Sequence, residues 1–159
     1  MLTTRDEWLA SLTRVYAAAG CLITDEGGRV LIVKAGYREH WQFVGGTVDP
    51  GENPQQCAGR ELQEETGIVK EAGELLVVAW TNPSGELAYP AVHFLFDLGT
   101  VPAATPIVLP EGELDSYRWV EPAEALTLLG PARALRLEAG LQARADGRTR
   151  VVTSPGSGF

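Results

Sequence analysis

The stretch that decides the fold is GTVDPGENPQQCAGRELQEETGI, residues 46–68. It contains a strong helix start, because Asn53 can cap free backbone amides and Pro54 is preorganised for the first helical position. The helix should run to Thr66 and end at Gly67, a residue type that ends helices readily. We therefore expect a helix of about three to four turns directly after a glycine-containing loop.

Three glutamates recur along this predicted helix. Glu61, Glu64 and Glu65 stand at positions i, i+3 and i+4, so their carboxylates share one face. Three like charges this close repel one another, and a hard cation that prefers oxygen ligands, such as Mg²⁺ or Mn²⁺, would offset the repulsion. A solvated acidic helix face is the alternative for the glutamates alone. The glycines and Glu52 upstream complete a larger pattern and favour the metal site.

The residues before and within the helix have their own expected roles. Gly45 and Gly46 allow the backbone to turn sharply and to approach a ligand closely. Glu52 lies at the mouth of the helix, where a carboxylate complements the helix dipole and could pair with Arg60. Arg60 either orients a carboxylate through a two-pronged contact, which we favour, or binds phosphate. Within the same helix, Cys57, Ala58 and Leu62 should turn inward to the core.

The spacing from Gly46 to Ile68 follows G-x5-E-x7-R-E-U-x-E-E-x-G-U, where U is a bulky aliphatic residue, and every specified position is filled. A chance match has a probability of roughly 1 in 10^9 per register. The chain thus resembles the Nudix hydrolase family (MutT-like). The resemblance implies an α/β/α sandwich with a mixed β-sheet between helices. It also implies divalent-metal-dependent hydrolysis of the diphosphate linkage of a nucleoside diphosphate joined to another moiety, as in a nucleotide sugar, an ADP-ribose-like compound or a nucleoside triphosphate.

The resemblance also implies roles for individual residues. The metal ligands would be the carboxylates of Glu61, Glu64 and Glu65 and the carbonyl of Gly45. Arg60 would belong to the catalytic group. A general base is also required, and the glutamates available are Glu61 and Glu64 in the motif and Glu111 and Glu113 in a later loop. We favour Glu64 or Glu113, while a solvated acidic loop remains the alternative for Glu111 and Glu113.

The substrate is less well defined by the sequence. Family members that cleave ADP-ribose commonly carry a Pro about fifteen residues beyond the motif, and Pro83 stands at that position, although Asn-Pro-Ser-Gly is also a typical hairpin turn. Tyr37 and Trp41 could stack on a base, but aromatic residues on strands more often pack the core. His93, between Val92 and Phe94, is more often a strand histidine than a ligand.

Outside the motif, hydrophobic patterns predict an α+β fold in which helices cover a mixed sheet. The order is strands, one helix, more strands and then helices. A hairpin should join the first two strands through the Glu26-Gly27-Gly28 turn. The expected strands are 14–25, 29–34, 41–44, 74–81, 90–98 and 116–120, and the further helices are 4–13, 121–129 and 131–145.

Length and composition are those of one ordinary globular domain. The chain has 159 residues, of which 45% are hydrophobic and 21% are charged, so we expect a single domain over 1–159 with loose ends at about 1–12 and 154–159. The formal net charge of −8 disfavours binding to a nucleic acid polymer and favours a small nucleotide-type substrate. An acidic protein that handles phosphates needs extra positive charge at its site, and a bound cation would supply it.

Targeting signals and cysteine usage suggest a cytoplasmic protein. No apolar run resembles a secretory signal, and none is long enough to span a membrane. Cys21 and Cys57 are 36 residues apart by their numbers and fit two buried thiols in a reducing compartment. The resemblance also makes a homodimer one assembly to expect, since homodimers are common in the family.

Two other functions compete with hydrolysis. A non-catalytic Nudix-fold module could bind or sense a nucleotide, but it would be favoured by loss of motif glutamates, and none is lost. Isomerisation of a prenyl diphosphate would need a reactive cysteine outside the motif, whereas Cys21 lies in a predicted core strand. Metal-dependent hydrolysis is therefore the expectation.

Overall fold

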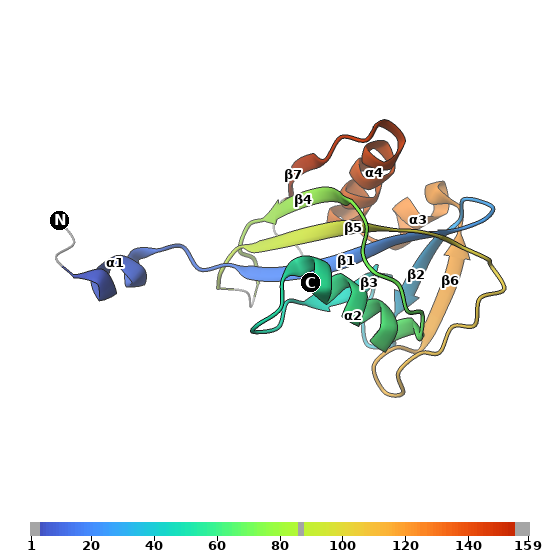
Figure 1. Ribbon diagram of the computed structural model, residues 1–159, viewed down its shortest axis with the longest axis horizontal. Coiled ribbons are helices and arrows are strands. Elements are labelled where there is room, and N and C mark those ends of the chain that lie inside the picture. The colour runs from blue at the N-terminus through green and yellow to red at the C-terminus, as the bar shows by residue number, and fades with distance from the viewer. Residues whose placement is uncertain (1–3, 86–87, 155–159) are drawn as a thin grey trace.

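The structure, a computed structural model, describes residues 4–85 and 88–154, which build one mixed β-sheet with helices on both faces (Figure 1). The strands in this part of the chain are β1 (Tyr16–Asp25), β2 (Val30–Lys34), β3 (Val44–Thr47), β4 (Leu75–Thr81), β5 (Ala91–Val101), β6 (Ser116–Val120) and β7 (Arg150–Ser154). The helices are α1 (Arg5–Ser11), α2 (Pro54–Thr66), α3 (Pro122–Leu128) and α4 (Pro131–Asp146). The expected α+β fold class with a mixed sheet is confirmed.

The strand β1 lies at the centre of the sheet. The strand order is β6-β2-β1-β5-β4-β7, and β3 pairs with β1 beside this path. One side of β1 pairs in parallel with β5 along its whole length. The other side is shared, because β2 meets β1 at Thr24 and β3 pairs antiparallel with Ala18–Cys21. The central strand thus places β3 and β5 on either side of the same few residues.

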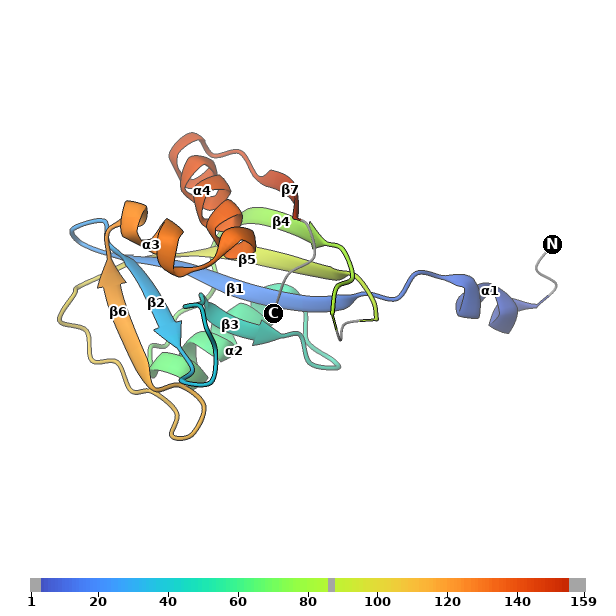
Figure 2. The ribbon, with the colours of Figure 1, turned by 180° about the vertical axis from the view of Figure 1, so that it is seen from behind.

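The two faces of the sheet are both covered, as the sandwich arrangement requires. Side chains alternate along a strand, and in β2 Leu31 and Val33 join the cluster under α2, whereas Val30 and Ile32 join the cluster under α3 and α4. Figure 2 shows α3 and α4 together on the face opposite α2. The strands are buried on both sides, and the predicted α/β/α sandwich is confirmed.

Two strand predictions need correction. The strand expected at 41–44 is wrong, because β3 runs from Val44 to Thr47 and includes both glycines, while Gln42 forms only an isolated bridge to Val33. The extended glycines are held by the backbone of β1, which the local sequence does not reveal. The strand β7 was not predicted, since it is short, half exposed and defined by its parallel pairing with β4.

The helix α4 is fixed to the sheet by an arginine near its end. Arg144 donates to both carboxylate oxygens of Asp97 on β5, at 2.6 and 3.0 Å. It also donates to the carbonyl of Leu22 on β1 at 2.8 Å. Because the guanidinium spans two strands, it sets how α4 lies across the sheet.

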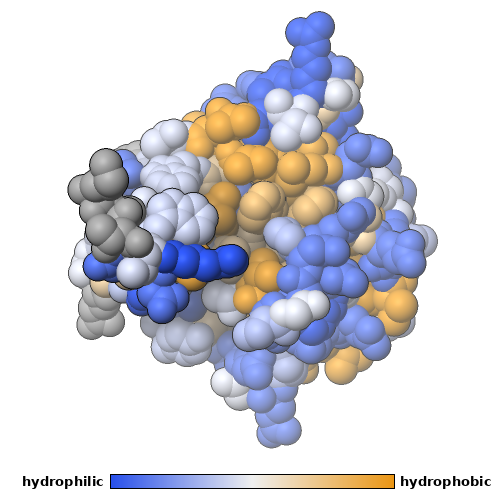
Figure 3. All heavy atoms as spheres, turned by 60° about the vertical axis from the view of Figure 1, so that its left-hand side comes forward, coloured by the Kyte–Doolittle hydropathy of each residue, from blue (hydrophilic) through white to orange (hydrophobic). Residues whose placement is uncertain are grey.

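The N-terminal helix α1 lies apart from the rest. It projects away from the sheet in both ribbon views (Figures 1 and 2) and buries none of its residues. Trp8, Leu9 and Leu12 are between 45% and 49% exposed. The face at this end of the molecule also carries a gathering of hydrophobic side chains bordered by hydrophilic ones (Figure 3). The core therefore does not depend on α1.

Two expectations about the rest of the chain can be checked directly. Cys21 and Cys57 are both free and buried, as expected. Among the helices of the described residues, none combines the length and the apolar composition needed to cross a bilayer. Of the ends expected to be loose, 1–3 and 155–159 lie outside the described residues. Ser154 itself is buried in β7, where its hydroxyl lies 2.9 Å from that of Thr81.

Candidate active site

The helix α2 begins and ends where its sequence predicts. The Asn53 side chain accepts from the backbone N–H of Gln56 at 2.9 Å, and the Gln56 side chain accepts from the backbone N–H of Asn53 at 2.9 Å. Gly67 ends the helix in the left-handed conformation, with φ 76°. Cys57, Ala58 and Leu62 are fully buried, as expected. Burial of this face turns the glutamates of α2 towards β3 and solvent.

The glycine pair in β3 allows close contact with the helix and with β1. The backbone N–H of Gly45 donates to Glu65 Oε2 at 2.8 Å. A Cβ at Gly45 would overlap the carbonyl oxygen of Ala19, and its φ of 149° disfavours any other residue. A Cβ at Gly46 would overlap the carboxylate of Glu61. Each glycine thus places a glutamate of α2 directly against the backbone of β3.

Arg60 is the centre of a network of carboxylates. Its Nε and Nη2 donate to the two oxygens of Glu52 at 3.0 and 2.7 Å, a two-pronged contact. Its Nη1 donates to Glu61 Oε1 at 2.8 Å and to Glu64 Oε2 at 2.9 Å. The hydrogen bonds from Arg60 lower the pKa of Glu52 to about 2. The expected pairing of Glu52 with Arg60 is confirmed, and the guanidinium orients carboxylates as we favoured.

Glu65 is the most buried of the three glutamates, with 8% of its surface exposed. Its pKa is raised to about 7, mainly by burial and also by the charges of Glu61, Glu113 and Glu64, against the lowering effect of the Gly45 N–H. Glu113 is exposed, yet it lies close enough for its charge to act on Glu65. The site therefore carries more negative charge than the nearby guanidinium of Arg60 neutralises.

The donor set fits a hard divalent cation, although the side chains do not yet converge on one. In residues 4–85 and 88–154, no three His, Cys, Asp or Glu side chains are grouped as a metal site. The reason is visible in the network, since Arg60 Nη1 already lies against both Glu61 and Glu64. The guanidinium of Arg60 thus occupies the point between the carboxylates of Glu61 and Glu64. All three glutamates offer the oxygen ligands that Mg²⁺ prefers. Their metal-binding roles, and that of the Gly45 carbonyl, stay predictions.

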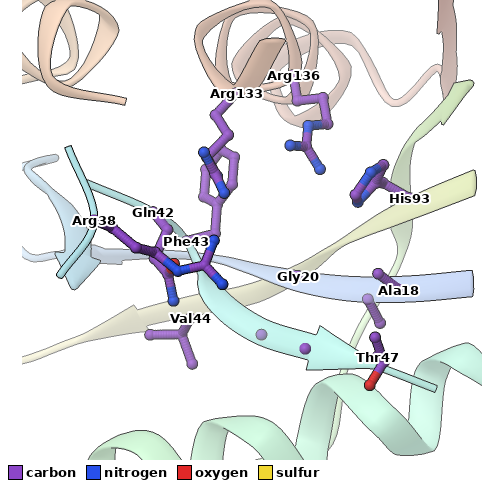
Figure 4. Close-up of a pocket in the computed structure, with 13 residues that line it drawn as sticks. Ala18, Gly20, Arg38, Gln42, Phe43, Val44, Thr47, His93, Arg133 and Arg136 are labelled. Atoms are coloured by element: carbon purple, nitrogen blue, oxygen red, sulfur yellow. The ribbon is translucent and has the colours of Figure 1, made fainter. Parts of the chain in front are cut away.

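A cavity of about 250 Å³ lies beside β3, between the sheet and α4 (Figure 4). The backbone of Gly45, Gly46 and Thr47 forms part of its wall. The cavity also carries four side chains that the sequence did not single out as a group: Arg38 from the loop before β3, His93 from β5, and Arg133 and Arg136 from α4. The described lining residues include no Asp or Glu.

One signal in the sequence could have indicated the cavity. Arg136 stands at a core position of the helical pattern of α4, four residues after the buried Ala132 and next to the buried Leu137. A charged residue at such a position is unusual unless it is paired or functional. Arg38 and His93 carry no comparable signal, because their proximity to α4 arises only in the folded sheet.

The structure does not bring the aromatic candidates for substrate binding into this cavity. Tyr37 is 79% exposed on the loop before β3. Trp41 packs against the core, with Arg118 and Lys34 at 5.7 and 6.0 Å from its ring centre. Pro83 is exposed in the connection between β4 and β5. None of the three is among the described lining residues, so a role in substrate binding stays a prediction for each.

Comparison with known proteins settles the family. Residues 15–141 match the NUDIX domain family. The chain belongs to the Nudix family. The matched region extends from just before β1 into α4 and includes all of α2. The family resemblance found in the motif is therefore confirmed.

Relatives of this Nudix protein act on varied compounds. The CTP pyrophosphohydrolase of Escherichia coli K12 is 31% identical over 77% of this chain and 90% of its own length. The RNA pyrophosphohydrolase of Pseudomonas aeruginosa PAO1 is 37% identical, but only over 40% of this chain and 38% of that protein. With the family shown and relatives named as pyrophosphohydrolases, the chain is a hydrolase that acts on phosphoric anhydrides.

Solved structures agree with the fold. The MutT protein of Methanosarcina mazei Go1 has a TM-score of 0.70 and 25% identity, covering 84% of this chain and 99% of its own. The Ap4A hydrolase of C. elegans has a TM-score of 0.63 and 26% identity, covering 84% of this chain and all of its own. Nudix hydrolases generally need a divalent metal, which agrees with the acidic face of α2.

Proposed function

We propose that this Nudix hydrolase cleaves the diphosphate linkage of a nucleoside diphosphate joined to another moiety, with Mg²⁺ or Mn²⁺ as its cofactor. One observation carries the proposal: the three glutamates of α2 lie along one face, two of them directly against the glycine pair of β3. Their negative charge is only partly compensated by Arg60. A solvated acidic face would not need glycines that bring the backbone so close.

The proposed roles follow from the contacts. Glu61, Glu64 and Glu65, with the carbonyl of Gly45, would hold the cation. When bound, the cation would neutralise the diphosphate and lower the pKa of a bound water. Arg60 keeps the carboxylates of Glu61 and Glu64 near each other and so positions two of the proposed ligands.

Two glutamates remain candidates for the general base. The side chain of Glu64 is 58% exposed, so water can reach its carboxylate. Glu113, in the loop before β6, is exposed and acts electrostatically on Glu65. Both carboxylates belong to the same acidic region. Either of them could therefore accept a proton from a water molecule that lies between it and the substrate.

The substrate is proposed to be a small nucleotide-type compound rather than a nucleic acid polymer. The relatives named for CTP and Ap4A, which match this chain over 90% and 100% of their own length, support a small nucleotide. The RNA pyrophosphohydrolase matches over only 38% of its length. The net charge of −8 argues against a polymer. The two free thiols are consistent with a reducing, cytoplasmic setting. We also propose that residues 1–159 form a single domain.

The proposal is tested by a panel of substrates with and without metal. The panel contains CTP, ADP-ribose, a dinucleoside polyphosphate and a nucleotide sugar, each assayed with Mg²⁺, with Mn²⁺ and with EDTA. We expect release of a nucleoside monophosphate from at least one compound only when a metal is present. Glu64→Gln and Glu65→Gln should lower kcat/KM by at least about 100-fold, since each removes a proposed ligand.

The matched control is Glu138→Gln, which removes one exposed carboxylate from α4, away from the acidic face. Its kcat/KM should stay within about twofold of the wild-type value. Turnover of Glu64→Gln and Glu65→Gln equal to that of the control would contradict the assignment. Binding of a nucleotide without turnover of any compound would instead favour the non-catalytic binding module.

A further inference from the structure

The cavity beside β3 collects arginine side chains, and the two that come from α4 have no carboxylate partner among the described residues. Arg133 and Arg136 extend from α4 towards the sheet, and Arg38 approaches the same space from the other side (Figure 4). Arg136 is 8% exposed, and its one hydrogen bond within the described residues is a long contact of 3.4 Å to the carbonyl of Ala132 in its own helix. In residues 4–85 and 88–154, no carboxylate lies within 4.0 Å of Arg133 or Arg136.

The same helix shows how this chain treats an arginine that has a structural role. Arg144, two turns further along α4, makes an ion pair with Asp97 at 2.6 Å and also donates to two oxygens of β1. Arg136 is more buried than Arg144 and, in the part of the chain that the structure describes, has no such pair. A buried guanidinium without a counter-charge is strongly unfavourable. The position of Arg136 therefore lowers the stability of the fold.

The neighbouring groups respond to this excess of positive charge. Burial, and then the charge of Arg133, lower the pKa of Arg136 to about 9. Burial, and then the charge of Arg38, lower the pKa of Arg133 to about 10. Burial and the same two arginines of α4 lower the pKa of His93 to about 3, so this imidazole is neutral. An anion in the cavity would relieve the repulsion among all of these groups.

Position and size indicate which anion fits. Gly45, Gly46 and Thr47 of β3 form part of the cavity wall. The same strand also contacts the glutamates of the acidic face of α2. A molecule in the cavity is therefore a neighbour of the proposed site of cleavage. A volume of about 250 Å³ is below the ~300–1,000 Å³ of pockets for drug-sized ligands. It suits one charged group of a larger substrate rather than a whole nucleotide.

We propose that Arg38, Arg133 and Arg136 form a subsite for an anionic group of the substrate, a phosphate or carboxylate that is separate from the two phosphates joined by the cleaved bond. This inference rests on the proposed function and narrows its substrate class. Nucleoside triphosphates and other derivatives with a further anionic group would be preferred over nucleotide sugars with a neutral sugar. Arg133 and Arg136 are then specificity-determining residues, because planar guanidinium groups bind such oxyanions with two parallel hydrogen bonds.

A structural role for Arg136 predicts a different behaviour from a binding role. If Arg136 serves stability, its replacement should lower the midpoint of thermal unfolding. If Arg136 serves binding, Arg136→Met should leave the midpoint unchanged or raise it, because an apolar side chain of similar size replaces an uncompensated charge. Arg133→Gln is a second variant at a half-buried position, and it keeps the test valid if Arg136→Met fails to fold.

The first experiment measures anion binding without catalysis. Inorganic phosphate is titrated in the presence of EDTA, and the unfolding midpoint is followed for the wild type, Arg136→Met, Arg133→Gln and the control Arg148→Gln. Arg148 is exposed beyond the end of α4, so the control loses the same charge outside the cavity. We expect phosphate to raise the midpoint of the wild type and the control, and the rise to fall to about a third or less in the cavity variants. Equal rises in all four proteins would overturn the subsite.

The second experiment ties the subsite to the substrate. With metal present, Arg133→Gln and Arg136→Met should raise KM for CTP by about 10-fold or more and change kcat by less than about threefold, as expected for lost binding. KM for a nucleotide sugar should change by less than about twofold. An equal rise for both compounds would overturn the proposed preference. Phosphate binding that depends on the arginines while KM for CTP is unchanged would show a site for free phosphate and would also contradict the inference.

The two experiments separate this inference from the proposed function. If the wild type hydrolyses no compound of the panel, the proposed function fails and the assignment of the cavity to a substrate fails with it. The phosphate titration in EDTA does not depend on turnover. Hydrolysis of CTP that is unaffected by the cavity variants would leave the proposed function standing and overturn the subsite alone.

Discussion

At the scale of single residues, the acidic site depends on one arginine and two glycines. Arg60 lies against Glu52, Glu61 and Glu64, so the carboxylates that repel one another are held in place by a shared positive charge. Gly46 has no side chain, and only for this reason can the carboxylate of Glu61 lie against β3. A small substitution at Arg60 or Gly46 should therefore lower the rate of hydrolysis more than it lowers the stability of the fold.

Gly46→Ala tests this dependence. The added methyl group would displace the Glu61 carboxylate, which is a flexible side chain, so we expect kcat/KM to fall by about 10-fold or more with little change in stability. The measurement combines steady-state kinetics with thermal unfolding of the same samples. The matched control is Gly59→Ala, where the new methyl group would meet only the carbonyl of Lys70 at 3.4 Å. Retained activity in Gly46→Ala would show that the position of Glu61 does not matter.

At the scale of secondary-structure elements, α2 is defined by its own sequence. Asn53, Pro54 and Gly67 set its ends, and both ends agree with the prediction. The first strand pair and the helix α4 were also recognised, because each has a long apolar pattern or a clear turn. The strands β3 and β7 were misplaced or missed, since their existence depends on pairing with β1 and β4, which are distant in sequence.

Asn53→Ala tests how far the cap determines the helix. The variant removes the acceptor of the Gln56 N–H and one half of the reciprocal contact, so unfolding should become easier by about 1 kcal/mol. Chemical denaturation measures the difference. Gln63→Ala, an exposed substitution in the same helix, serves as the reference and should change stability by less than about 0.5 kcal/mol. A loss in Asn53→Ala no larger than in the reference would mean that tertiary packing alone fixes the helix.

At the scale of the whole molecule, two regions of opposite charge lie on the two sides of β3. The acidic face of α2 was predictable, because its residues are neighbours in the sequence and follow helical spacing. Apart from the core position of Arg136, the cavity was not predictable, because Arg38, His93 and Arg133 come from three segments that meet only when β5 pairs with β1 and α4 packs across them. In a chain with a net charge of −8, these arginines supply local positive charge where an anionic substrate would approach.

The isolated position of α1 leads to a prediction for the whole chain. Since α1 buries none of its residues, deletion of residues 1–11 should change the unfolding midpoint by less than about 2 °C. Hydrolysis of the best substrate should also be retained. Differential scanning calorimetry and kinetics of the shortened and full-length proteins check this. A large loss of stability would show that α1 packs in solution against something that the isolated chain does not display, such as a second copy.

The last strand has a consequence for how the protein is made. Before residues 150–154 leave the ribosome, β4, with its apolar sequence LLVVAWT, has one side without a neighbour. An unpaired apolar edge of this kind can pair with another newly made chain. Once β7 is in place, Arg150 brings a charge to the new edge, and charged edges resist such association. Pairing with residues 150–154 thus covers an edge of β4 that could otherwise associate with another chain.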